Sequence, residues 1–206
     1  MGSTAETRDA GRPMGRRAVL AGTAACAIAA AIAATGVPAA AERHPAVAFM
    51  HRARAVLLKA ARSGSTAQFL DAILRYADVP GIADYSLGRY GKGLPTSKRK
   101  QYQRGVALFM ARYFASQARE YQVVDADIDE TPRIDGDTVL VDSRIRLKDG
   151  RTYTVRWSLR KQRGGYRINN VRVLGFWLAY FQRAMFVDHI RSHGGNVESL
   201  IAALSR

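Results

Sequence analysis

The sequence has only one cysteine, Cys26, which lies in an alanine-rich segment near the N-terminus. A domain formed by residues 42–206 therefore has neither a disulfide nor thiol chemistry. Motifs of common enzyme classes are also missing, because the sequence holds no Gly-x-Ser-x-Gly nucleophile elbow and no glycine-rich phosphate-binding loop. These absences exclude several catalytic classes and favour a protein that acts by binding, not an enzyme.

The first 41 residues differ from the rest of the chain. Four arginines come before an uncharged, mostly alanine run over residues 18–41, which ends in three alanines and is followed by Glu42. A basic start, an apolar middle and small residues at the end predict a secretory signal peptide that is cleaved after Ala41. Arg16 and Arg17 indicate the twin-arginine export route. The alternative is a retained membrane anchor, since about 20 apolar residues can span a bilayer.

Acidic residues are scarce: 17 Asp and Glu stand against 32 Lys and Arg, which gives a net charge of +15. Cleavage after Ala41 removes four arginines and two acidic residues and leaves a mature domain, residues 42–206, with a charge of +13. A charge of this sign favours anionic partners, such as lipid headgroups or the acidic surface of another protein. We expect no nucleic-acid partner, because an exported domain does not meet nucleic acid.

The periodicity of apolar residues changes twice along the mature chain. Helical spacing predicts helices over residues 46–61, 66–74, 80–87 and 96–119. Alternation then predicts strands over residues 121–128, 139–147, 153–159 and 166–173, joined by turns at Asp149-Gly150 and Gly164-Gly165. Helical spacing returns from Phe176 to Ile190, and Asn196 caps a last helix. This order predicts an α+β fold, in which a twisted antiparallel meander packs against helices and encloses an apolar pocket.

The predicted meander has two unlike faces. One face is basic, because Arg144, Arg146, Arg156 and Arg160 alternate with apolar residues on neighbouring strands. These arginines either form a solvated surface or dock the protein on an anionic membrane or an acidic partner. The other face is apolar and lies opposite aromatic residues of the predicted helices. Such residues either fill a core or line a cavity for acyl chains, and composition alone does not decide between the two.

Metal sites are weakly supported. His189 and His193 are four residues apart on a predicted helix with Asp188 beside them, but the glutamate of a zinc protease is missing because Ile190 follows His189. An acidic run near residues 125–130 lacks the glycine of a calcium loop. We expect both groups to be solvated surface and predict no metal and no cofactor.

Three stretches of the chain resemble the MlaC-type periplasmic lipid-binding proteins, also called the toluene-tolerance auxiliary family. Residues 69–90 are similar to the family's helix pair ending in Leu-Gly-Arg-Tyr, and the long aromatic helix with the following meander has the family's order. Residues 166–204 match its Arg-x-x-Phe at Arg183 and its closing Leu-Ile-x-x-Leu. Two positions depart from the family pattern, since Asn170 replaces Asp and Phe176-Trp177 replaces Val-Ser. The second change enlarges the side chains beside the pocket that the resemblance implies.

The resemblance implies a soluble carrier that holds lipid acyl chains in an apolar pocket, without catalysis. Its implied partners are a glycerophospholipid or a hopanoid, an inner-membrane ABC lipid transporter with a lipid-binding ring, and an outer-membrane lipoprotein complex. A hopanoid-transport accessory protein, a structural adaptor with a solid core and an enzyme of similar fold are the alternatives. The residues that we expect to bind lipid are Phe69, Ile73, Leu87, Phe109, Tyr113, Val141, Ile145, Val155, Trp157, Leu159, Val173, Phe176 and Trp177.

Overall fold

The computed structural model describes residues 43–206. The predicted signal peptide, its cleavage point and Cys26 lie outside the described residues, so these expectations stay predictions. Within residues 43–206, no helix combines the length and the apolar character needed to cross a membrane.

Four helices form the first part of the domain, as the helical spacing predicted. They are α1 (Pro45–Ser63), α2 (Thr66–Tyr76), α3 (Val79–Leu87) and α4 (Arg99–Tyr121). Capping side chains explain where three of them begin: His44, Ser65 and Asp78 each accept a hydrogen bond from a backbone amide of the first turn. Two short 3-10 turns, Gly88–Gly93 and Thr96–Lys98, connect α3 to α4. The helix α4 continues through Tyr121, where the sequence predicted the start of a strand.

The sheet is an antiparallel meander with two small additions. Its strands are β1 (Val123–Ile128), β2 (Arg133–Asp135), β3 (Thr138–Leu147), β4 (Thr152–Gln162), β5 (Gly165–Val173) and β6 (Phe176–Trp177). Their order is β1-β3-β4-β5-β6, and β2 pairs with β3 at its start. β2 and β6 were not predicted, because two or three residues are too few to show an alternating pattern.

The strand β6 corrects the expectation that a helix includes Phe176. Leu174 and Gly175 have positive φ angles of 49° and 90°, and they turn the chain back along β5. Phe176 then pairs with Val173, and Trp177 pairs with Arg172. The helix α5 (Leu178–Ser192) begins only after this pairing, and α6 (Val197–Leu204) follows it.

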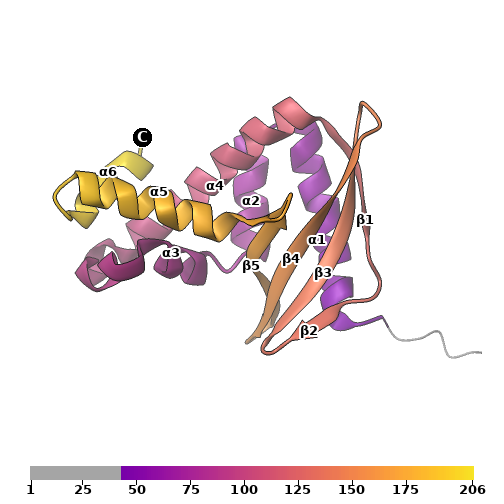
Figure 1. Ribbon diagram of the computed structural model, residues 1–206, viewed down its shortest axis with the longest axis horizontal. Coiled ribbons are helices and arrows are strands. Elements are labelled where there is room, and N and C mark those ends of the chain that lie inside the picture. Colours follow the sequence, from indigo (N-terminus) through magenta and orange to yellow (C-terminus); the bar gives the residue numbers. More distant parts are fainter. Residues whose placement is uncertain (1–42) are drawn as a thin grey trace, which may run out of the picture. The chain divides into compact units, whose positions relative to one another are not determined.

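The helices lie on one side of the sheet, which confirms the predicted α+β class (Figure 1). The helix α1 covers β1, β3 and β4 and forms a core with them. A second core joins α3, α4, α5 and α6, with Tyr102 and Ile190 completely buried in it. Figure 1 shows α5 leaving the β5–β6 edge of the sheet and crossing α4. The β1 side of the sheet is therefore covered by α1, and α5 begins at the β6 edge.

Candidate functional site

The residues predicted to bind lipid divide into a buried and an accessible group. The buried ones are at most 6% exposed and comprise Phe69, Ile73, Leu87, Val141, Ile145, Val155 and Leu159. Phe109, Trp157, Val173 and Trp177 are half-buried, whereas Tyr113 is 43% exposed and Phe176 is 60% exposed. Only the second group offers surface to a ligand in this conformation.

The buried group does not converge on one place. Val141 and Leu159 pack on α1, whereas Phe69 and Ile73 pack between α2 and α4. Leu87 belongs to the core of the later helices. Ile145 and Val155 belong to a further cluster with Leu58 of α1. Four clusters therefore hold these side chains, and the lipid-binding role of the buried residues stays a prediction.

The inner face of the sheet, which the helices face, becomes more accessible from β3 towards β6. One cross-strand row shows this, because Ser143, Val155, Val173 and Phe176 are paired in turn across four strands and share this face. Ser143 is 1% and Val155 is 5% exposed, Val173 is half-buried and Phe176 is 60% exposed. The cause is coverage: α1 lies over β3 and β4 but does not extend over β6.

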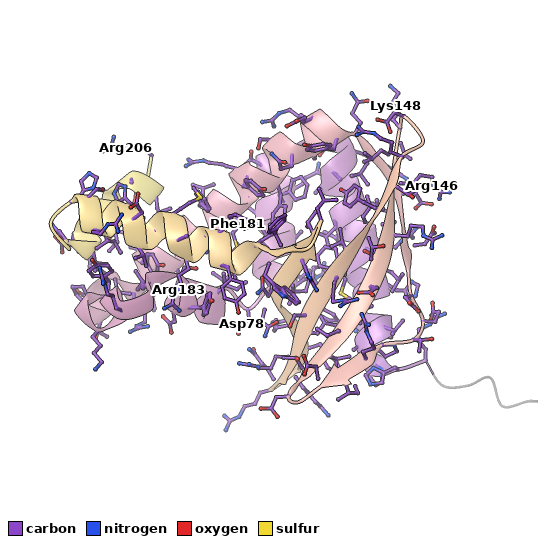
Figure 2. All side chains as sticks on the ribbon, in the orientation of Figure 1. Asp78, Arg146, Lys148, Phe181, Arg183 and Arg206 are labelled. Carbon is purple, nitrogen blue, oxygen red and sulfur yellow. The ribbon has the colours of Figure 1, made fainter. Side chains whose placement is uncertain are left out.

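The start of α5 extends this accessible surface. Phe181 packs edge-on against Phe176, with ring centroids 5.6 Å apart, and Met185 follows one turn later. Phe181 is 52% and Met185 is 56% exposed. Figure 2 shows Phe181 on the side of α5 towards α2 and α4. We define the apolar strip as Trp157, Val171, Val173, Phe176, Phe181 and Met185.

An aromatic residue of α4 contacts α5 at the residue after Met185 of the strip. Phe109 of α4 packs edge-on against Phe186 of α5, with centroids 5.1 Å apart. Tyr113, one turn further along α4, is 43% exposed. In Figure 1, α4 and α5 cross and then separate towards the sheet. The contact between Phe109 and Phe186 therefore joins α4 to α5 beside Met185 of the strip.

Phe181 and Met185 were not among the residues predicted to bind lipid. The buried stripe of α5 is Ala179, Gln182, Phe186 and Ile190. Phe181 and Met185 are each one position before a buried residue, so they form a second, parallel stripe at helical spacing. Two adjacent apolar stripes make the apolar side of α5 wider than the stripe that packs against the core. This width was visible in the sequence and could have identified Phe181 and Met185.

Trp177 lies on the opposite face of the sheet from Phe176, because successive strand residues alternate. It pairs with Arg172, whose guanidinium lies over the indole ring, 6.0 Å from the centroid. Phe176 and Trp177 were both predicted to bind lipid, but they lie on opposite faces of the sheet, and only Phe176 is on the inner face.

The predicted basic face exists but is partly neutralised. Arg156 donates two hydrogen bonds to Asp142, at 2.7 and 2.9 Å, and Arg146 forms an ion pair with Asp125. The Ala126 amide, which donates to Asp125, lowers the pKa of that carboxyl, and the neighbouring guanidinium groups lower it further. Within residues 43–206, Arg144 and Arg160 have no carboxylate at ion-pair distance.

Most of the residues considered as metal ligands contact other protein groups, whereas Nε2 of His189 is buried without a hydrogen-bond partner within residues 43–206. The rings of His189 and His193 stack with centroids 4.2 Å apart, and Nδ1 of His193 lies 2.8 Å from the carbonyl oxygen of His189. In the acidic run, Glu130 contacts Arg43 and His51, each at 2.7 Å. Among the described residues, no group of three potential ligands is arranged to hold a metal ion.

Two open hollows occur at the C-terminal end of α1, away from the strip. The larger has a volume of about 540 Å³ and a basic lining of Arg54, Lys59 and Arg62. The smaller, of about 280 Å³, lies between Gly64, Arg119 and Lys148. Their charged walls do not suit acyl chains, so the strip is the better candidate for an apolar ligand.

The domain is thus a small α+β protein whose antiparallel sheet has its apolar face covered at one edge and accessible at the other. The structure is similar to that of a phospholipid-binding protein from Ralstonia solanacearum solved with a phospholipid. The two are 19% identical, with a TM-score of 0.64 over 79% of this chain and 96% of the other. This likeness establishes the fold. No curated protein matches the sequence.

The family model described as MlaC protein matches residues 50–206. The chain therefore belongs to the MlaC family, as the resemblance in its sequence indicated.

Proposed function

We propose that this protein is a lipid carrier of the bacterial periplasm and that the apolar strip contacts the acyl chains. The observation that carries the proposal is the exposure of the inner face at the β5–β6 edge. In the folded domain Val173 is half-buried there and Phe176 is 60% exposed. The family and the fold support it, because a structural neighbour is a phospholipid-binding protein. The strip has no titratable side chain, so it offers no acid or base for catalysis.

The energy available from such a surface is large. Burying a lipid chain is worth about 0.8 kcal/mol per CH₂, so a 16-carbon chain provides on the order of 12 kcal/mol before ordering costs. Side chains at the strip, such as Met185 and Phe181, have freedom to move aside when a chain enters, because they are more than half exposed. A tight complex therefore needs no catalytic group and no cofactor.

The carrier role includes partners and a route. We propose that residues 1–41 direct export and that the mature domain moves a glycerophospholipid or a hopanoid between an outer-membrane lipoprotein complex and an inner-membrane ABC transporter. A soluble intermediary is required physically, since a lipid tail does not cross an aqueous compartment unaided at a useful rate. The family assignment supports this role.

Extraction of the purified protein with organic solvent, followed by mass spectrometry, tests the proposal. We expect lipid at close to one molecule per protein, and its mass distinguishes a glycerophospholipid from a hopanoid. Protein that is folded yet free of lipid, and that takes up none from vesicles, contradicts the carrier function and favours the structural adaptor.

Electrostatic docking through the basic face is a second part of the proposal. Since Arg146 and Arg156 are engaged with Asp125 and Asp142, we expect Arg144 and Arg160 to contribute most. A basic residue near an anionic surface is worth about 1 kcal/mol. The double variant Arg144→Glu/Arg160→Glu should therefore bind anionic vesicles or the transporter at least tenfold more weakly.

Exposed charges are screened over about 8 Å at physiological salt. Binding by the unmodified protein should consequently weaken as salt rises, and the double variant should show a smaller salt dependence. Lys98→Glu/Lys100→Glu, at two exposed lysines near the start of α4, makes the same change in net charge away from the basic face and is the control. Equal weakening by the control and the double variant, or binding independent of salt, would show that the basic face is not the docking site.

A further inference from the structure

The turn between β5 and β6 is apolar, exposed and conformationally unusual. Leu174 is 73% exposed, more than any other large hydrophobic side chain among residues 43–206, and its φ is 49°. Leucine rarely adopts this left-handed conformation, whereas glycine and asparagine adopt it readily. Leucine at this position is unfavourable both for solubility and for backbone conformation, and this combination points to a functional role.

The surroundings of the turn combine apolar, aromatic and basic groups. Phe176 is 60% exposed beside Leu174, and Trp177 follows it. Nε of Arg172 donates a hydrogen bond of 2.9 Å to the Gly175 carbonyl, and its guanidinium lies over the Trp177 ring. An exposed aliphatic end with an aromatic and a basic group behind it matches the layers of a bilayer surface, from acyl chains to headgroups.

The charged side chain nearest the turn, Arg172, is not neutralised. Its cross-strand neighbour Arg156 is engaged with Asp142, whereas within the described residues no carboxylate lies at ion-pair distance from Arg172. The positive side of this turn complements anionic headgroups, in keeping with the net charge of +15.

The turn is also continuous with the apolar strip. Phe176 pairs with Val173, so the inner face of the sheet ends at the turn, and Phe181 packs on Phe176 from α5. A surface that meets the turn therefore also meets the end of the strip.

We propose that the turn formed by Leu174, Gly175 and Phe176 inserts into the interfacial layer of a bilayer that contains anionic lipids. In this orientation Arg172 and Trp177 lie at the headgroups, and the strip opens on the acyl layer. An acyl chain then moves from bilayer to strip without crossing water. The inference rests on the proposed lipid-carrier function, because the strip is its lipid site.

Tryptophan fluorescence tests insertion directly. The chain has two tryptophans, so Trp157→Phe leaves Trp177 as the only reporter, next to the turn. We expect phosphatidylcholine vesicles containing phosphatidylglycerol to shift its emission to the blue, and lipids brominated on the acyl chain to quench it. Vesicles of phosphatidylcholine alone should give a much weaker response.

Leu174→Asn is the decisive variant in this background. Asparagine tolerates the left-handed backbone, so the fold is kept while the apolar side chain is lost. We expect partitioning onto the anionic vesicles to fall about tenfold, as removal of a buried leucine side chain predicts. Ile134→Asn, at an equally apolar and 65% exposed position on β2, is the control and should partition like its parent.

Co-purified lipid, measured on the unmodified protein and on Leu174→Asn made in it with both tryptophans kept, separates this inference from the carrier function. Retained lipid in Leu174→Asn with lost partitioning supports insertion, whereas retained lipid with unchanged partitioning overturns it. An unmodified protein that inserts but never carries lipid contradicts the carrier function alone. If Leu174→Asn instead abolishes only self-association, or only binding to an envelope protein, the turn is a protein interface and the membrane proposal is wrong.

Discussion

Val155→Asp is expected to leave the domain unfolded at ordinary temperature. Val155 is 5% exposed and packs with Leu58, Ile145 and Leu147 between α1 and the sheet. An aspartate there buries a charge with no cation to pair with it, and this costs several kcal/mol. A domain of this size has only about 5–15 kcal/mol of stability. Loss of the near-ultraviolet circular dichroism signal and of a cooperative thermal transition is the expected measurement.

Two substitutions on the same strand control for this result. Thr154→Asp places the same charge one residue away, on the exposed face opposite Arg144, and should melt close to the unmodified protein. Val155→Ala removes apolar contact without adding charge, and we expect a loss of about 2 kcal/mol. A folded Val155→Asp variant with a near-normal melting temperature would mean that Val155 lines a hydrated cavity, the alternative that its sequence left open.

Periodicity predicted much of the fold because each long element exposes one side. The stripe of α1 and the alternation of β3 and β4 extend over at least ten residues each, which is long enough for the 3.6- and 2-residue periods to be distinguished. The turn at Asp149-Gly150 and the cap at Asn196 followed from the special chemistry of those residues. β6 was missed because its two residues are defined by pairing with β5, which is a tertiary contact.

The site was harder to predict for a physical reason. Val141 and Val173 have the same chemistry and lie on the same face, yet one is completely buried and the other half-buried. The difference is set by where α1 ends over the sheet, which no local pattern records. The predicted set therefore mixed core residues with accessible ones. The ion pair between Arg156 and Asp142 could not be predicted either, because it depends on the register of β3 and β4.

Phe181→Asp is expected to abolish lipid binding while the protein stays folded. Phe181 is 52% exposed, so an aspartate at this position is hydrated in the empty protein and costs little stability. With lipid bound, the carboxylate lies against acyl chain without a partner, and its desolvation costs several kcal/mol. Each 1.4 kcal/mol is tenfold in affinity, so we expect co-purified lipid to fall by at least tenfold.

The neighbouring residue supplies a matched control, since Tyr180 is an aromatic of similar exposure, at 60%, on another side of α5. It packs edge-on against Tyr85 of α3, with centroids 5.8 Å apart, and does not belong to the strip. Tyr180→Asp should therefore keep its lipid, and both variants should melt near the unmodified protein. The two substitutions add the same charge to the same helix, so a difference in lipid content can arise only from the side of α5 that they change. Equal lipid in both variants would place the acyl chains elsewhere, and equal loss would mean that the binding depends on the net charge of α5 and not on the apolar strip.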